Sequence, residues 1–165
     1  MNSSKSISSA LVALLASATT VLVVQACGGS AEAANGDPAD PIEGVWDSTV
    51  TNKDCASGAV LRTFKGISSF QHGGALVADN SMPVPSRGVG LGVWKAGAGR
   101  DYTASFTFMR FNPDGSLAGS QSVVRTLTLS ADAHSITGTI AAQQFDTAGA
   151  PTLAICASES GVRLH

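Results

Sequence analysis

The sequence predicts an all-β domain of eight antiparallel strands that close into an up-and-down barrel, with a two-sheet β-sandwich as the alternative. Two observations support this prediction. Residues 42–165 are rich in Gly, Thr, Ser and Val and show almost no helical periodicity. Turn-forming residues also recur at intervals of about 10 to 18 residues, which is typical of a β-meander. Eight strands joined by short turns can remove both sheet edges by closing on themselves.

Turn signals divide the domain into its predicted strands. The clearest turn is the Asn-Pro-Asp-Gly sequence at 112–115, with Pro at its second position and Gly at its fourth. The Pro-containing segment 80–87 separates an N-terminal from a C-terminal half. The predicted strands are 43–52, 58–65, 67–79, 88–96, 101–112, 116–130, 135–146 and 151–164.

Alternation of side chains indicates which faces of the strands point inward. Tyr102, Phe106 and Phe108 share one face of the strand 101–112, and Thr and Ser residues occupy the other. This period of two is expected of a half-buried strand. The interior of an eight-stranded barrel is just wide enough for side chains or for one small ligand.

The first 26 residues predict a signal peptide. Residues 1–9 are polar with a single positive charge, Lys5, and residues 10–24 form an apolar run. The run of about fifteen residues has the length of a signal h-region and is short of the roughly 20 residues that a membrane-spanning helix needs. No other stretch of the sequence approaches that length.

The sequence Val-Gln-Ala-Cys at 24–27 resembles the lipobox of bacterial lipoproteins. The resemblance implies lipidation of Cys27, and hence a protein anchored to a membrane of the bacterial cell envelope. In a Gram-negative cell, Gly28 after the cysteine, rather than Asp, implies the outer membrane, with the protein facing the periplasm or the cell surface. The alternative is cleavage after Ala33, which gives a soluble periplasmic or secreted protein.

Residues 27–41 are small, polar and punctuated by Pro, so we expect a lipid-anchored flexible tether there. The remaining residues, 42–165, are enough for a single β-barrel domain with one core.

Trp46 at the start of the first strand and Arg163 near the end of the last resemble a pattern of the calycins, the lipocalin-like barrels. In that family a first-strand tryptophan packs under an arginine of the final strand. The resemblance implies a structural role for both residues. The domain is also similar in outline to the barrels of allene oxide cyclase and dirigent proteins.

The cysteines test this arrangement. In an antiparallel pair the numbers of facing residues have a constant sum, which is 209 for Trp46 with Arg163 and 211 for Cys55 with Cys156. If the first and last strands are neighbours, one register brings both pairs together. We therefore predict a disulfide between Cys55 and Cys156 at the closing seam, because exported proteins meet an oxidising environment. The alternative is that Cys55 lies in a loop and reaches Cys156 by another route.

Several classes of chemistry lack sequence support. After the predicted signal peptide, nine basic and twelve acidic side chains remain without a cluster of either sign, which argues against a nucleic-acid partner. The three histidines lack the spacing of a zinc site, and the glycines of the 88–99 segment lack the spacing of a dinucleotide site. The sequence predicts no metal and no cofactor.

Polar side chains on otherwise apolar faces predict a ligand-binding pocket. They converge if those faces line the barrel interior, as in most small-ligand sites. Because a buried unpaired arginine is costly, an anion or a carboxylate partner is expected. The alternative is that Arg110 and Arg125, near strand ends, reach solvent. The candidate ligand-binding residues are His72, Tyr102, Arg110, Gln121 and Arg125.

Three functions remain open from the sequence. The first is an envelope-anchored, non-enzymatic barrel that binds a small amphipathic or acidic molecule. The second is an isomerase or cyclase similar to allene oxide cyclase and dirigent proteins, with His72 or Tyr102 as its acid or base. The third is a structural envelope protein without a ligand. The sequence determines neither a ligand nor an oligomeric state.

Overall fold

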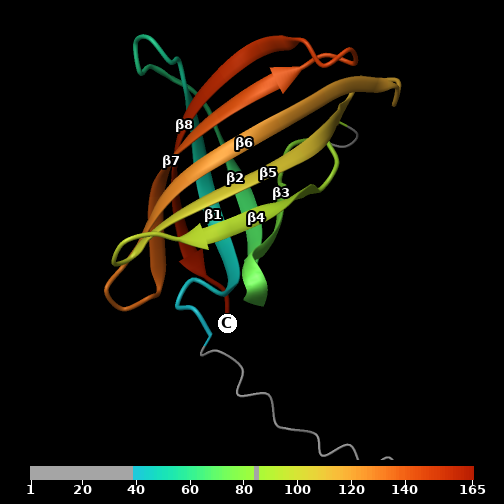
Figure 1. Cartoon of the computed structure of the whole chain (residues 1–165). Helices are drawn as coiled ribbons and strands as arrows, with labels where there is room; N and C mark the ends of the chain where they lie inside the picture. The colour runs from blue at the N-terminus through green and yellow to red at the C-terminus, as the bar shows by residue number, and fades with distance from the viewer. Residues whose placement is uncertain (1–38, 84–85) are drawn as a thin grey trace, which may run out of the picture. The chain divides into compact units, whose positions relative to one another are not determined.

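The computed structural model describes residues 39–83 and 86–165, which form a closed barrel of eight antiparallel strands (Figure 1). Each strand pairs with the next and β8 pairs with β1, so the sheet has no free edge. The predicted barrel is confirmed and the sandwich alternative is wrong. The elements are β1 (Gly44–Lys53), β2 (Val60–Phe70), η1 (His72–Gly74), β3 (Ala75–Asn80), β4 (Gly90–Ala96), β5 (Asp101–Phe111), β6 (Leu117–Leu129), β7 (Ser135–Phe145) and β8 (Pro151–Arg163).

The predicted signal peptide 1–26, the predicted lipidation site Cys27 and most of the predicted tether lie outside the described residues. Asp40 and Pro41, at the end of the predicted tether, are described and already contact the barrel.

One predicted turn is wrong. The sequence prediction ended the second strand before Gly66, whereas β2 continues through Gly66 to Phe70. The chain turns instead at η1, where Gly73 and Gly74 have φ angles of 79° and 88°, a left-handed conformation that glycine adopts without steric cost. The other six predicted strands begin and end within two residues of the observed bounds.

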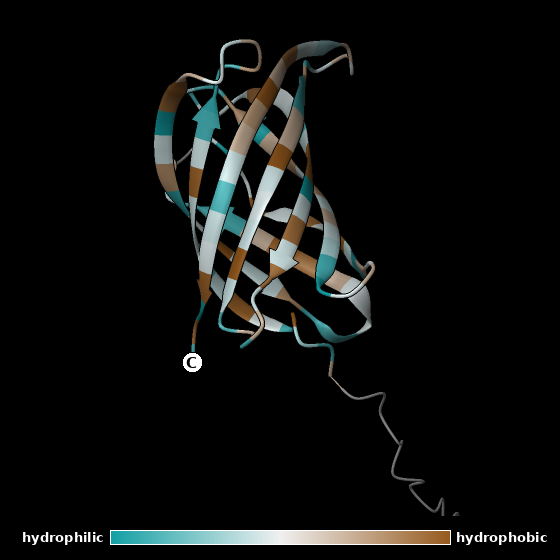
Figure 2. Ribbon diagram, turned by 90° about the vertical axis from the view of Figure 1, so that its left-hand side faces the viewer, coloured by the Kyte–Doolittle hydropathy of each residue, from teal (hydrophilic) through white to brown (hydrophobic). Residues whose placement is uncertain are grey.

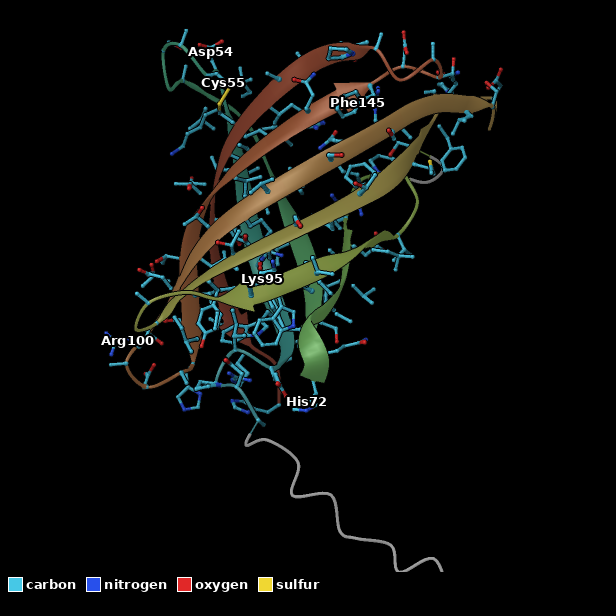
Figure 3. The ribbon with its side chains drawn as sticks, in the orientation of Figure 1. Asp54, Cys55, His72, Lys95, Arg100 and Phe145 are labelled. Atoms are coloured by element: carbon cyan, nitrogen blue, oxygen red, sulfur yellow. A yellow bond between two sulfur atoms is a disulfide. The ribbon has the colours of Figure 1, made fainter. Side chains whose placement is uncertain are left out.

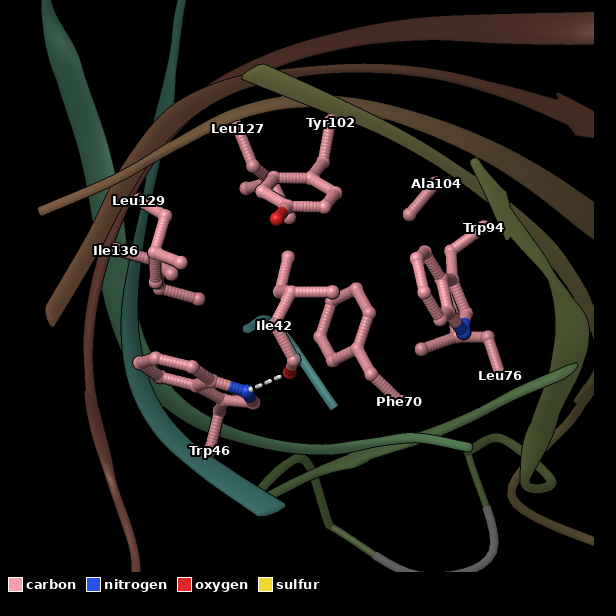
Figure 4. Close-up of a cluster of buried hydrophobic side chains, with 10 residues drawn as sticks. All are labelled: Ile42, Trp46, Phe70, Leu76, Trp94, Tyr102, Ala104, Leu127, Leu129 and Ile136. Atoms are coloured by element: carbon pink, nitrogen blue, oxygen red, sulfur yellow. Dashed lines mark hydrogen bonds between the residues drawn. The ribbon is translucent and has the colours of Figure 1, made fainter. Parts of the chain in front are cut away.

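A hydrophobic cluster closes one end of the barrel (Figure 4). Ile42, just before β1, has no exposed surface, and its carbonyl accepts a 2.8 Å hydrogen bond from Trp46 Nε1. The segment before β1 therefore belongs to the seal. The cluster consists of Ile42, Trp46, Phe70, Leu76, Trp94, Tyr102, Ala104, Leu127, Leu129 and Ile136.

Polar and apolar residues are interleaved along the strands rather than gathered into one band (Figure 2). This arrangement follows from the period-two geometry of strands, in which neighbouring side chains point to opposite faces of the sheet.

The seam between β1 and β8 has the predicted register. Trp46 faces Arg163, and the guanidinium lies 4.4 Å from the Trp46 ring centroid. Arg163 also donates to three backbone carbonyls of the closed end: from Nη1 to Glu43 at 2.5 Å, from Nε to Ala133 at 3.0 Å, and from Nη2 to Pro41. One side chain of β8 thus joins the segment before β1 to the turn between β6 and β7.

The predicted disulfide between Cys55 and Cys156 is present, with a Cα–Cα distance of 5.2 Å. In the β1–β8 ladder Cys156 pairs with Lys53, so the predicted facing position of Cys55 is wrong. Cys55 lies in the turn two residues beyond Lys53, as the alternative expected, and reaches Cys156 from there. The bond therefore closes the seam at the end of the barrel opposite the hydrophobic cluster. Figure 3 shows Cys55 and Phe145 at that end and His72 and Arg100 at the other.

Gly92 of β4 lets the strand pass close to β5. A Cβ added at Gly92 would lie 1.9 Å from the Ser105 carbonyl oxygen and 2.5 Å from Phe106 Cα, so the backbone itself would have to move. We expect Gly92→Ala to lower the free energy of unfolding by about 1–3 kcal/mol, the usual cost of overpacking. Urea denaturation measures this change. Gly88→Ala is the control, because its Cβ would meet no atom nearer than 3.8 Å. Equal stability of the two variants would contradict the prediction.

Candidate functional site

A cavity of about 290 Å³ occupies the part of the barrel that the hydrophobic cluster leaves open. It lies toward the end with the β1–β2, β3–β4, β5–β6 and β7–β8 turns, which we call the mouth. Its polar residues gather at two levels, the floor and the mouth, and between them its wall is largely apolar. The apolar lining residues include Val50, Phe64, Ala78, Phe106, Phe108, Phe111, Val123, Ile140, Ala142 and Ile155.

The floor of the cavity is a buried ion pair. Arg125 Nε donates to Glu159 Oε2 at 2.8 Å and Nη2 donates to Glu159 Oε1 at 2.5 Å, and Nη1 donates to Ser68 Oγ at 2.9 Å. The two charged side chains are only 3% and 2% exposed. The three residues come from β6, β8 and β2. On each strand the next inward-facing residue toward the closed end is also buried; these residues are Leu127, Gly161 and Phe70. The floor therefore separates the sealed core from the cavity.

Charge pairing explains how Arg125 can be buried. Removing a guanidinium from water is costly unless a carboxylate with good geometry faces it, and Glu159 provides a bidentate partner. The alternative that Arg125 reaches solvent is wrong. The expected carboxylate partner is Glu159, which the sequence analysis did not identify, although it alternates in β8 with the buried residues Ala157 and Gly161.

The mouth of the cavity is cationic. Arg62 and Arg110 line it, and within residues 39–83 and 86–165 neither takes part in an ion pair. The cavity lining holds four arginines against Asp79 and Glu159, an excess of two positive charges. Anionic groups are therefore favoured at the mouth.

Arg87 also lines the upper cavity but is already held in place. Its guanidinium lies 3.9 Å from the Phe108 ring centroid, and Nη2 donates to the Ala78 carbonyl at 3.1 Å. Burial lowers the pKa of Arg87, and the nearby charge of Asp79 opposes that shift. Arg87 thus reinforces the wall between β3 and β5.

Three of the five predicted ligand-binding residues line the cavity: Arg110, Gln121 and Arg125. Gln121 Oε1 accepts a 3.0 Å hydrogen bond from Gln144 Nε2. Arg110 is half-buried, and Gln121 lies on the same wall, so the mouth carries both a cation and an amide pair.

His72 and Tyr102 lie elsewhere. His72 is exposed in η1 at the closed end, where Nδ1 is 3.1 Å from Glu43 Oε1. The predicted strand 67–79 would have placed His72 on an inner face. His72 does not reach the cavity because the chain turns at η1, which begins at His72 itself. Tyr102 points inward but belongs to the sealing cluster, and its hydroxyl donates to Asp40 Oδ1 at 2.7 Å.

Tyr102 is a reporter of the seal, since it is the only tyrosine of the chain. Burial, together with the hydrogen bond to Asp40 and its charge, raises the pKa of Tyr102 to about 12. An unfolded tyrosine has a pKa of about 10, so the folded state retains its proton where the unfolded state loses it. We expect the stability contribution of Tyr102 to be complete below pH 10 and to fall as the pH rises toward 12.

The tyrosinate absorbance of the folded protein should therefore titrate near pH 12. The same titration in denaturant should fall near pH 10, the ordinary value for tyrosine. Tyr102→Phe should remove this part of the alkaline loss of stability. Titration of the folded protein at the unfolded value would contradict the burial of Tyr102 and its bond to Asp40.

Among the described residues, no group of three or more His, Cys, Asp or Glu side chains is arranged to hold a metal ion. In the same part of the chain, no helix is long and apolar enough to cross a membrane.

These features define a class of structure: a small antiparallel β-barrel that is sealed at one end and contains a cavity with an apolar wall, a paired-charge floor and a cationic mouth. No protein-family model matches the sequence, and no curated protein matches it either.

Proposed function

We propose that this protein is a non-enzymatic carrier or receptor that binds a small amphipathic acid in its barrel. The observation that carries the proposal is a cavity that combines an apolar, aromatic wall with two mouth arginines, Arg62 and Arg110, that have no carboxylate partner among the described residues. An apolar body of the ligand would contact the aromatic wall, and its anionic group would lie between these arginines. Such a division of apolar and charged contacts is usual in small-ligand sites.

The proposal includes a calycin-like barrel in the bacterial cell envelope. Support for the calycin likeness comes from Trp46 and Arg163, which stack at 4.4 Å on the first and last strands. The lipobox-like sequence around Cys27 supports lipid anchoring. Because Asp40 and Ile42 lie in the closed end, the barrel would be tethered from that end, opposite the mouth.

Titration with anilinonaphthalene sulfonate, a fluorescent amphipathic anion, tests the proposed function. The probe should bind the wild-type protein, and Arg62→Gln/Arg110→Gln should weaken its affinity about tenfold or more, since each arginine can form a charge-assisted hydrogen bond. Lys95→Gln/Arg100→Gln is the matched control. It removes the same charge from residues near the closed end that are exposed and do not line the cavity.

Equal weakening by both double variants would indicate a general charge effect and would contradict a specific site. Native mass spectrometry of protein purified from its own cells should show a bound organic acid. Protein that is empty in this experiment and does not bind the probe would refute the proposal.

The two other functions have less support from individual side chains. The proposed acids of an isomerase or cyclase, His72 and Tyr102, do not line the cavity, and the carboxylate of Glu159 is paired with Arg125. A structural barrel without a ligand would be expected to fill its lumen, whereas about 290 Å³ is open.

A further inference from the structure

The floor of the cavity has hydrogen-bonding capacity that the protein does not use. A guanidinium carries five N–H groups. Arg125 uses one on Nε and one on Nη2 toward Glu159, and one on Nη1 toward Ser68. One N–H on each terminal nitrogen has no acceptor among the described residues. Phe70, whose ring centroid is 5.5 Å away, offers only its π face.

Unsatisfied donors in a buried group are costly, so an acceptor is expected to meet them. Arg125 lines the cavity together with Ser68 and Glu159, so that acceptor can come from the cavity side. Ser68 Oγ can donate its own hydrogen, and the Glu159 carboxylate has further lone pairs. The floor therefore offers both donors and acceptors to a bound group.

An anion is disfavoured at the floor. Glu159 already neutralises Arg125 at 2.5 Å, and a second carboxylate beside it would face a like charge in a buried environment. A neutral group that both accepts and donates, above all a hydroxyl, matches the floor best. The floor and the mouth thus select different chemistry.

The two levels are separated by the length of a small molecule. Arg62 precedes Ser68 by six positions on β2, and Arg110 pairs with Gly119, six positions before Arg125 on β6. Six residues correspond to about 20 Å of strand, or roughly 15 Å along the barrel axis at the usual strand tilt.

We propose that the ligand is an elongated hydroxy acid, with its carboxylate at Arg62 and Arg110 and its hydroxyl on the Ser68, Arg125 and Glu159 floor. This inference rests on the proposed function and specifies the class of acid. The floor is a specificity determinant, because it forms hydrogen bonds with a hydroxyl at the end of the ligand opposite the carboxylate. A wholly apolar pocket would disfavour that hydroxyl.

Competition titrations against anilinonaphthalene sulfonate provide the test. The protein is purified from its own cells, with whatever N-terminal processing those cells carry out. The competitors are ω-hydroxy acids of eight, ten and twelve carbons, the corresponding unsubstituted acids, and the corresponding diacids. We expect the best-fitting hydroxy acid to bind about tenfold more tightly than its unsubstituted counterpart, as for a hydrogen bond to a charged group. The diacid should bind no better than the unsubstituted acid.

The decisive variant is Arg125→Met/Glu159→Leu, which removes both charges together and leaves an apolar floor of similar size. It should still bind the unsubstituted acids and should lose the preference for the hydroxyl. Ser68→Ala, a smaller change at the same level, should reduce the preference while retaining the ion pair.

Three results separate the outcomes. A hydroxyl preference that disappears in the double variant supports the inference. Equal binding of hydroxylated and unsubstituted acids in the wild-type protein, still dependent on Arg62 and Arg110, refutes the inference and leaves the proposed function intact. Failure of every acid and of the fluorescent probe to bind refutes both.

Discussion

Arg125→Met should lower the free energy of unfolding by about 3–5 kcal/mol, the usual cost of leaving one member of a buried ion pair without its partner. In this variant Glu159, whose side chain is 2% exposed, would lose both hydrogen bonds to the guanidinium. The penalty comes from the stranded carboxylate rather than from the lost attraction. Guanidinium chloride denaturation, followed by tryptophan fluorescence, measures it.

The double variant Arg125→Met/Glu159→Leu distinguishes these two contributions. If the stranded charge causes the loss, removing Glu159 as well should restore most of the stability, since apolar replacement of a buried ion pair is often neutral or favourable. Ser68→Ala removes a single bond to the guanidinium and should cost only about 1–2 kcal/mol. A double variant that is as unstable as Arg125→Met would show that the ion pair itself stabilises the barrel.

Opening the disulfide should have an effect of similar size. Cys55 and Cys156 are 101 residues apart, so the bond closes a loop that contains β2 to β7 and restricts it in the unfolded state. For a loop of this length the entropic model gives up to about 4–5 kcal/mol, and removal of native disulfides costs about 2–5 kcal/mol in practice. Cys55→Ser/Cys156→Ser should therefore unfold at a clearly lower denaturant concentration. The same shift is expected for the wild-type protein under reducing conditions.

The barrel itself should survive this change at low temperature, because the β1–β8 register extends from Trp46 to Lys53 independently of the bond. The control is Ser57→Ala in the same turn, which removes the hydrogen bond that Ser57 Oγ donates to Asp54 and the one it accepts from the Ala59 N–H, and leaves the seam closed. It should change stability by less than about 1 kcal/mol, as exposed substitutions usually do. Equal destabilisation by both variants would place the effect in the turn rather than in the crosslink.

Most of the barrel could be predicted because its turns carry strong local signals. The exception between β2 and β3 has a physical cause. Gly66 was interpreted as a break, yet its inner position requires no unusual backbone conformation, whereas Gly73 and Gly74 adopt positive φ angles. A pair of adjacent glycines is a better turn signal than a single glycine in a strand.

The alternation of apolar residues fails in β4, where Leu91 and Val93 face outward and are 65% and 53% exposed. Gly90 and Gly92 face inward in their place, because Phe106 of β5 occupies the space that their side chains would need. No single strand contains this information, since it depends on the size of a residue on the next strand.

The candidate site was predictable only in part. Arg110, Gln121 and Arg125 were found from their positions on apolar faces, and the cost of burial predicted a partner for Arg125. Glu159 itself was missed because it lies 34 residues away along the chain, and only the register of the closed sheet brings the two together. Arg62 lies within the predicted strand 58–65, but its inward position could not be recognised. The buried residues that mark the inner face of β2, Ser68 and Phe70, lie beyond the predicted end of that strand.

The division of each strand between a sealed half and a cavity half has a consequence for evolution and for engineering. On β6, Leu127 and Leu129 serve the seal, whereas Gln121 and Val123 line the cavity. Substitutions in the upper half can therefore alter what is bound while the lower half continues to hold the fold together. A barrel organised in this way is a suitable scaffold for selecting new ligand specificities, because variation and foldability reside at opposite ends of the same strands.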